Sequence, residues 1–450
     1  MKKYKIVITT ALLILLVVFV VLYKNWQRQA YKEVVHADAT TIIKVDVNEL
    51  MKTLAWDFVG NMEYYSSKEE DSISGEKSDG KGINIPASVF LYTVPKASNT
   101  IFCTLKISDS TQAISYLSKT LGASHEVKRE GFYQKTNKKK TISIAQLDKT
   151  VVIALSYKKE DVSKVFEEIL IHKKYMVPTH HLLQQLINEE HHISIAGRKE
   201  MMLHLDGKDG VIELTGSFNN SSEIIFNKSS KVPSFSNNKC IQMYMSGKPK
   251  NKLSLSKIFG KEINWGTTTL ATDSITQHFN DLITFQLGGT TFQKDSIITY
   301  EYNDDFEKVP VVSLKEKTVP NMSLSITADS TNTIERYLKN SRVIDKNQFV
   351  KEIPFYQFYA AQKENKFIVS TSKEFSLPFQ KTEMSTDFFR IQVHIDQLIK
   401  ENHFPIINSY ISSMNSIDIK AKNNDTKTIH LEGIITFKER TINAFTQIFK

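Results

Sequence analysis

The chain has 450 residues, of which 41% are hydrophobic and 24% are charged, and its formal net charge is +9. Six of its 58 basic residues lie in residues 1–32, which hold no acid, so the remainder carries 52 basic against 49 acidic side chains. That near balance is not the basic surface of a typical nucleic-acid-binding protein, and we expect no nucleic-acid partner.

The chain contains only two cysteines, Cys103 and Cys240, which cannot build a disulfide-rich scaffold. Each lies in an apolar, strand-like run. We expect two small buried thiols at these positions, and a single bridge between them is the alternative.

The first predicted element is an apolar helix from Ile6 to Tyr23. As a helix its residues would extend about 27 Å, enough to cross a ~30 Å hydrocarbon core. No small-x-small cleavage site follows, which favours an uncleaved signal anchor over a removed signal peptide. The lysines before the span predict a cytoplasmic N-terminus. We therefore predict that residues 1–32 form a tail and transmembrane anchor in a bilayer, and that the rest is periplasmic, in a single-pass protein of the bacterial inner membrane.

The next elements alternate between strands and capped helices. Thr41–Val47 reads as a strand that leads into an amphipathic helix, and residues 66–82 read as a polar loop. Asp109 offers an N-cap oxygen to a helix whose apolar residues recur at helical spacing. A hairpin follows at 141–156, and an amphipathic helix with a stripe of apolar residues begins at Val162.

The second half of the chain repeats segments of the first half in the same order. Four pairs of segments match at offsets of about 220 residues, which favours an internal duplication; the pairs are Leu105–Leu117 with Leu324–Leu338, Glu130–Gln134 with Glu352–Gln357, Val151–Ser156 with Phe367–Ser372, and Leu214–Gly216 with Leu431–Gly433. We predict a first repeat at 33–225, a linker at 226–238 and a second repeat at 239–450. Strands that return through hairpins predict an α+β fold, with two duplicated halves of antiparallel sheet and helices packed on one side after the N-terminal transmembrane helix.

The best metal candidates are two histidine pairs, His180-His181 and His191-His192, beside Glu189 and Glu190. A helix between the pairs would hold them about 16 Å apart, which excludes one shared ion, so we predict surface histidines and no metal ligand.

Other candidate groups have simple structural explanations. The run Asp206–Gly210 lacks the acid spacing of a calcium loop and reads as a hairpin turn. Gly288-Gly289 lacks phosphate-loop spacing and reads as a turn between strands. Carboxylate pairs such as Glu69-Glu70 and Asp304-Asp305 lie in polar loops.

No signature of nucleophilic catalysis is present, and the repeated Phe-Tyr-Gln runs at 132–134 and 355–357 are interpreted as packing, with an aromatic ligand groove as the alternative. The sequence thus predicts no catalytic residue, no cofactor-binding residue and no metal ligand.

The run Ala37-Asp38-Ala39-Thr40-Thr41-Ile42-Ile43, followed by an amphipathic helix, resembles an uncharacterised family of bacterial envelope proteins found particularly in Bacteroidota. Members open with an Ala-Asp-Ala-Ser/Thr-aliphatic strand and are anchored or lipid-modified. This chain differs at His36, where the family tends to carry proline. The resemblance implies an envelope location and an architecture, and it brings no catalytic residues.

These observations together predict a membrane-anchored extracytoplasmic protein that is more a binding protein than an enzyme. Its partner would be another protein or a ligand of the envelope. The alternative is an envelope hydrolase or transferase with an unrecognised site.

Overall fold

The computed structural model describes residues 31–66, 82–198, 200–220, 224–226, 230–250, 256, 260–328, 333–375, 381–423 and 428–448. The chain divides into two units. Unit 1 comprises Met1–Asp209 and Thr441–Thr446, and unit 2 comprises Gly210–Arg440 and Gln447–Lys450. A short C-terminal segment therefore belongs to the unit built from the first part of the chain.

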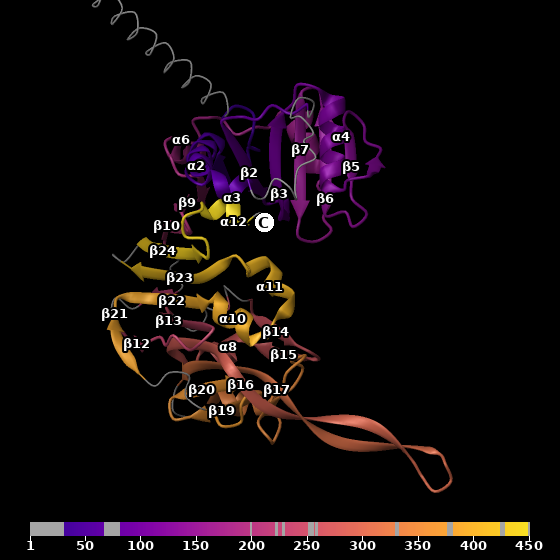
Figure 1. Cartoon of the computed structure of the whole chain (residues 1–450), viewed down its shortest axis with the longest axis vertical. Coiled ribbons are helices and arrows are strands. Elements are labelled where there is room, and N and C mark those ends of the chain that lie inside the picture. Colours follow the sequence, from indigo (N-terminus) through magenta and orange to yellow (C-terminus); the bar gives the residue numbers. More distant parts are fainter. Residues whose placement is uncertain are drawn as a thin grey trace, which may run out of the picture. The chain divides into compact units, whose positions relative to one another are not determined.

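Unit 1 is built on one antiparallel sheet with the strand order β9-β8-β1-β2-β3-β7-β6-β5-β4 (Figure 1). The strands are β1 (Thr41–Asp46), β2 (Ser88–Val94), β3 (Ala97–Lys106), β4 (His125–Val127), β5 (Tyr133–Thr136), β6 (Ile142–Leu147), β7 (Thr150–Ser156), β8 (Ile193–Gly197) and β9 (Met201–Lys208). The predicted hairpin at 141–156 is confirmed as β6 and β7.

The helices of unit 1 follow the local signals of the sequence. They are α2 (Val47–Gly60), α3 (Met62–Ser66), α4 (Ser110–Leu121), α5 (Ser163–Leu170) and α6 (His181–Ile187), and α12 (Ala444–Ile448) begins in the C-terminal segment. Asp109 caps α4 by accepting a hydrogen bond from the Gln112 backbone N–H at 2.9 Å, as predicted. The helix ends at Gly122, whose φ of 68° is favourable only for residues such as glycine.

Helices cover both faces of the unit 1 sheet, because neighbouring residues of a strand point in opposite directions. Ile144 of β6 packs with the apolar side of α4, whereas the next residue, Ala145, belongs to the core formed with α5 and α6. Val151 and Val152 of β7 are divided in the same way. The prediction of helices on one side is therefore wrong for this unit.

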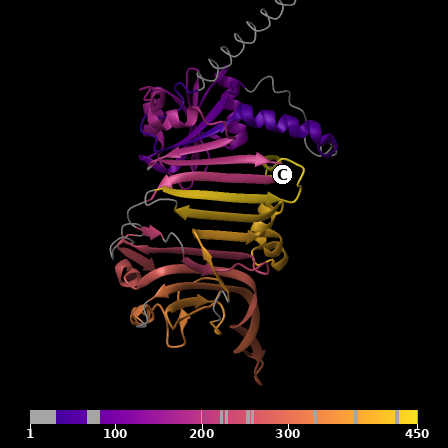
Figure 2. The same cartoon turned by 90° about the vertical axis from the view of Figure 1, so that its left-hand side faces the viewer.

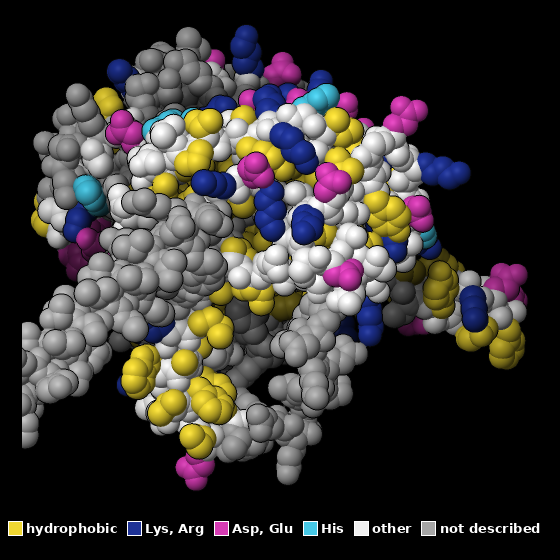
Figure 3. All heavy atoms as spheres, turned by 90° about the horizontal axis from the view of Figure 1, so that it is seen from above, with side chains coloured by type: hydrophobic (Ala, Val, Ile, Leu, Met, Phe, Trp, Pro, Cys, Tyr) yellow, Lys and Arg dark blue, Asp and Glu magenta, His cyan; other side chains and the backbone are white. Residues whose placement is uncertain are grey.

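One helix of unit 1 contributes little to the core. Only Asp57 of α2 is buried, whereas Met51, Trp56 and Val59 are exposed, and Figure 2 shows the helix extending beside the sheet. The face of the molecule drawn in Figure 3 has basic and acidic side chains interspersed, in keeping with the balanced charge of the chain beyond residue 32.

The strands of unit 2 are also antiparallel neighbours, in the order β10-β24-β23-β22-β13-β16-β17-β20-β19-β18. Its strands are β10 (Val211–Asn219), β13 (Ile241–Pro249), β16 (Phe279–Tyr302), β17 (Lys308–Ala328), β18 (Phe349–Val350), β19 (Phe358–Lys363), β20 (Lys366–Ser370), β22 (Asp387–His394), β23 (Met414–Asn423) and β24 (Thr428–Phe437). β16 and β17 continue beyond their neighbours as a long two-stranded arm (Figure 1).

Smaller elements flank the unit 2 sheet. In the described part of unit 2, two two-stranded ribbons, a short strand beside the end of β13 and several short helices lie around the sheet. These elements are β12 (Ser230–Pro233) with β21 (Thr382–Ser385), β14 (Glu262–Trp265) with β15 (Thr268–Ala271), β11 (Ile224–Phe226), α8 (Thr272–Thr276), α9 (Thr333–Asn340), α10 (Ile395–Glu401) and α11 (Pro405–Ile411).

The two units share one strand order. The sequence β9-β8-β1-β2-β3-β7-β6-β5 in unit 1 has the counterpart β23-β22-β13-β16-β17-β20-β19-β18 in unit 2, and a helix follows the fifth strand of each (α4 and α9). The repeated Leu-x-Gly motifs face each other between β10 and β24, where Leu214 pairs with Gly433 and Gly216 pairs with Leu431. An internal duplication predicts such an order; the repeat limits at 33–225 and 239–450 and the linker at 226–238 stay predictions.

The predicted fold class is wrong. Strands make up 50% and helices 21% of the described residues, so the protein is mostly antiparallel sheet and not α+β. Apolar residues that alternate with polar ones favour an extended strand and not a helix, and many of the strands are long. Most of the helices are short and pack against the sheets.

The predicted transmembrane helix is also corrected. Within the described residues, no helix is both long and apolar enough to cross a membrane. The longest of them, α2, has 14 residues, about 21 Å of helix, and carries Glu49 and Asp57. The predicted span at 6–23 lies outside the described residues. No helix of the described residues supports the predicted signal anchor or the single-pass inner-membrane localisation, and both are withdrawn.

The cap of α4 gives a stability prediction. Asp109→Ala should lower the free energy of unfolding of unit 1 by about 1 kcal/mol, because the Gln112 N–H loses its acceptor. Urea unfolding followed by circular dichroism measures the change. Ser110→Ala, at the next position, is the control and should leave the midpoint unchanged. Equal midpoints for the two variants would contradict the capping role.

Candidate functional site

An apolar pocket in unit 2 has a volume of about 420 Å³. It lies between one face of the sheet and a cover made by the β14–β15 ribbon, α8, α9 and the segment around β18. Sixteen of its seventeen lining residues are hydrophobic; they are Ile263, Trp265, Leu270, Ile275, Phe285, Met322, Leu324, Leu338, Val343, Ile344, Val350, Ile353, Phe358, Ala360, Phe367 and Val369, and the other is Ser323.

The floor of the pocket follows from strand register. Phe285 of β16 pairs with Leu324 of β17, Leu324 pairs with Val369 of β20, and Val369 pairs with Ala360 of β19. These four residues form one row across four strands and point to one face. Ser323 belongs to the neighbouring row with Gln286 and Ser370, so its side chain faces the opposite side of the sheet.

Hydrogen bonds hold the cover in place. The Trp265 indole N–H donates to the Lys351 carbonyl at 2.8 Å, which ties β14 to the segment after β18. The Tyr337 hydroxyl of α9 accepts a hydrogen bond from the Ala271 backbone N–H at 2.9 Å, which ties β15 to the helix. The ribbon is therefore attached on both sides of the pocket.

The chemistry available in this pocket is limited to apolar contact. No acidic, basic or thiol side chain is among its lining residues, so none of them can act as an acid, a base or a nucleophile. The arrangement can exclude water and accept an apolar group.

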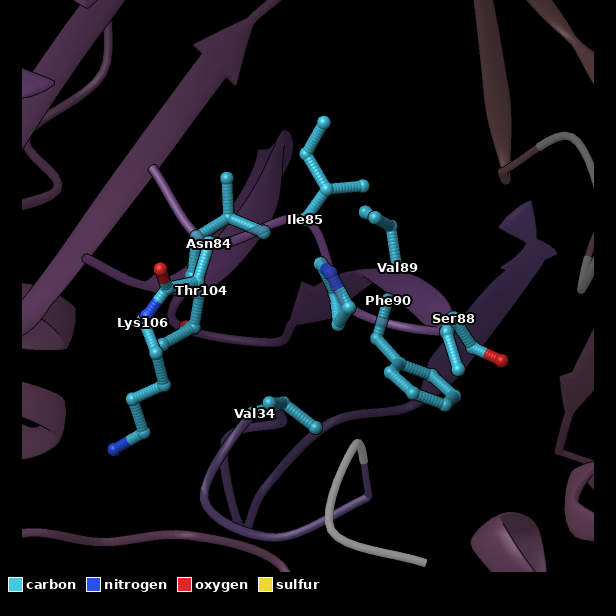
Figure 4. A pocket seen from close by; sticks show the side chains of 11 residues that line it. Val34, Asn84, Ile85, Ser88, Val89, Phe90, Thr104 and Lys106 are labelled. Atoms are coloured by element: carbon cyan, nitrogen blue, oxygen red, sulfur yellow. The ribbon is translucent and has the colours of Figure 1, made fainter. Parts of the chain in front are cut away.

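A second pocket, in unit 1, has a volume of about 210 Å³ and a mixed lining (Figure 4). Val34 and Phe90 contribute apolar surface, and Lys106 contributes its ammonium group. That group is engaged, because it donates to a Glu33 carboxylate oxygen at 2.8 Å and lies 5.8 Å from the centre of the Tyr175 ring. The pocket offers little free charge to a ligand.

Both cysteines are free and buried, which confirms the prediction of buried thiols. Burial raises the pKa of the Cys103 thiol to about 12. Burial, together with a hydrogen bond to Glu401, raises the pKa of the Cys240 thiol to about 12. A thiol held in this state is a poor nucleophile.

The repeated aromatic runs serve different purposes. Phe132 packs edge-on against Phe166 of α5, at 6.4 Å between ring centres, and so belongs to the unit 1 core. Phe355 is 86% exposed, and all three residues of the second run line a pocket of about 210 Å³ in unit 2. Packing explains the first run and does not explain Phe355.

Three of the sequence interpretations of turns and loops can be compared with the structure. Of the predicted turn at Asp206–Gly210, Asp206 lies within β9 and only Asp209 and Gly210 separate β9 from β10. Gly288-Gly289 lies within β16, at an irregularity of its pairing with β17. Asp304 and Asp305 lie in the turn of the long arm, as expected for polar loop residues. Glu69 and Glu70 lie outside the described residues.

The two histidine pairs have different surroundings, and the second pair does not consist of simple surface histidines. His180 caps α6, since its Nδ1 accepts a hydrogen bond from the Leu182 N–H at 3.3 Å. His191 and His192 both contact the Asp206 carboxylate, at 2.5 and 3.1 Å. Glu189 lies beside His191 at 3.7 Å.

Sequence reasoning missed His204, whose ring lies 4.1 Å from that of His191, measured between centres. The hairpin register places His204 of β9 opposite Ser194 of β8. Burial, with a smaller effect of the His191 ring, lowers the pKa of His204 below its ordinary value. Burial alone would raise the pKa of Asp206, but the hydrogen bonds from the two histidines outweigh it and hold that pKa below its ordinary value. His204 and Asp206 lie two residues apart, and so on one face of a strand. This spacing, close after the His191-His192 run, was the signal that could have found the cluster.

Comparison with known proteins adds little. No protein-family model and no curated protein matches the chain. Solved structures similar to it include crystal form I of TP0453, with 8% identity, a TM-score of 0.23, and coverage of 75% of this chain and 89% of that chain. Crystal form III of TP0453 has 10% identity and a TM-score of 0.22, and covers 75% and 90%. TM-scores of this size do not establish a shared fold.

The thiol environments give a reactivity prediction. At about pH 8 the native protein should react only slowly with a thiol reagent such as dithionitrobenzoate, because buried thiols stay protonated. After unfolding in urea, two thiols per chain should react quickly. Rapid reaction of the native protein would contradict the buried environments, and no thiols after unfolding would show a bridge instead.

Proposed function

We propose that the protein is a non-catalytic binding protein, and that its unit 2 pocket takes a small apolar molecule with a largely aliphatic or aromatic body. The observation that carries the proposal is the continuous apolar lining of a 420 Å³ space. Ligand pockets of proteins span about 300–1,000 Å³, so the volume suits a small molecule.

The character of the lining favours an apolar occupant. The side chains of the pocket offer almost no hydrogen-bond partner to water, so water gains little by staying there. An apolar guest that displaces this water gains dispersion contacts with the lining and returns the water to bulk solvent.

The lining also favours binding over catalysis. A hydrolase or transferase needs groups that move protons or stabilise charge at the reacting atoms. The side chains that line this pocket offer none, so no observation on this pocket supports the alternative of an enzyme.

Fluorescence of Trp265 provides a direct test, because this residue lines the pocket. The chain has three tryptophans, and a Trp26→Phe, Trp56→Phe background leaves Trp265 as the single emitter. Titration with the neutral fluorophore N-phenyl-1-naphthylamine should give saturable energy transfer from Trp265 with one site per chain. Decanol should displace the fluorophore. Absence of saturable transfer would overturn the proposal.

A matched pair of variants on β19 separates filling the pocket from damaging the fold. Ala360 lines the pocket, whereas Ala361 points to the opposite face and packs with Ile368 and Phe375. Ala360→Leu should lower the affinity for the fluorophore about tenfold, a change of about 1.4 kcal/mol, while stability is kept. Ala361→Leu should lose about 1–3 kcal/mol of stability through overpacking and keep its affinity. The reverse pattern would contradict the assigned pocket.

A further inference from the structure

A cluster of side chains that can act as metal ligands lies in unit 1, separate in sequence from the residues of the apolar pocket. A Glu189 carboxylate oxygen is 3.7 Å from His191 Nε2 and 3.7 Å from His204 Nε2. One ligand atom from each of the three residues lies within 4.8 Å of the others. Metal–nitrogen and metal–oxygen bonds of about 2.0–2.2 Å place tetrahedral ligand atoms roughly 3.3 Å apart, so the two carboxylate–imidazole distances lie within a few tenths of an ångström of the spacing in such a site.

Each imidazole is held by its other nitrogen. His191 Nδ1 contacts an Asp206 carboxylate oxygen at 2.5 Å, and His204 Nδ1 contacts the Ser194 hydroxyl at 3.3 Å. Both Nε2 atoms are thereby left toward Glu189. Histidines that bind metal ions almost always have this partner on the second ring nitrogen, because it fixes the tautomer and the ring orientation.

The backbone around the cluster is also fixed. The buried Lys44 of β1 donates from Nζ to the Glu189 carbonyl at 2.6 Å and pairs with Asp46 at 3.1 Å. The β8–β9 register sets His204 opposite Ser194. These contacts come from three strands, so the positions of the ligand-bearing residues do not depend on one loop.

His192 has a different role from His191. Its Nδ1 contacts Asp206 at 3.1 Å, and its Nε2 contacts the Thr53 hydroxyl of α2 at 2.8 Å. Both ring nitrogens are therefore engaged, and His192 is a support for Asp206 and not a ligand.

We propose that Glu189, His191 and His204 bind one divalent transition-metal ion of the zinc class, with Asp206 and Ser194 as positioning residues. Two imidazoles favour zinc and its neighbours over magnesium and calcium, which take oxygen ligands. Three protein donors leave a coordination position for water or for a group from a partner.

A second histidine–carboxylate group in unit 1 differs from this cluster in the charges around its carboxylates. His36, Asp38 and Glu168 lie close enough to share an ion. Lysines already neutralise those carboxylates, because Lys96 Nζ is 2.5 Å from Glu168 and Lys174 Nζ is 2.7 Å from Asp38. This group is an ion-pair network, and we assign no metal to it.

Calorimetric titration of the full chain with zinc chloride tests the proposal. The wild type should bind one equivalent, and Co²⁺ in its place should give the intense visible absorption of a tetrahedral ion. His204→Ala and His191→Ala should abolish the one-to-one site. Asp206→Asn and Ser194→Ala should weaken it by roughly 10- to 100-fold without removing it. Circular dichroism of each variant without metal confirms that the fold is kept.

The His180→Ala, His181→Ala double variant is the matched control, because it removes two adjacent histidines of the same unit that lie outside the cluster. It should bind zinc as the wild type does. Zinc should raise the melting temperature of the wild type and of this control, and leave that of His204→Ala unchanged. Equal zinc affinity in the wild type and in a folded His204→Ala would overturn the proposal, as would the absence of stoichiometric binding.

Discussion

The register between antiparallel strands is the constraint on which both candidate sites depend. Side chains alternate between the two faces of a strand, so a slip of one residue would send every row of side chains to the other face. In unit 2, register aligns Phe285, Leu324, Val369 and Ala360 into one apolar row. In unit 1, the same rule sets Ser194 opposite His204. Contacts between distant residues thus follow from the backbone pairing.

Features with local causes could be predicted from the sequence. Asp109 is followed by apolar residues at helical spacing, and a capped helix lies there. The hairpin at 142–156 and the buried cysteines also follow from short runs of residues. In each case the deciding interactions lie within a few residues of one another, and pattern reasoning can use them.

Features decided by distant partners could not be predicted. The pattern in β6 shows apolar residues at both Ile144 and Ala145, and only the fold reveals that a different helix covers each of them. Asp206 beside glycines resembles a turn, yet it pairs with histidines 14 and 15 residues earlier. The apolar pocket draws its walls from residues between 263 and 369, a span no local period describes.

The C-terminal segment of unit 1 has a consequence for synthesis of the protein. Asn443 donates from its side-chain amide to the Gly207 carbonyl at 3.1 Å, and the ring of Phe445 lies 5.5 Å from that of His192. Unit 1 therefore cannot complete its packing on the ribosome before residue 446 has been made, although most of its sheet is translated before residue 210. Chains usually fold domain by domain as they emerge. Here the first unit lacks these contacts until the second has been translated.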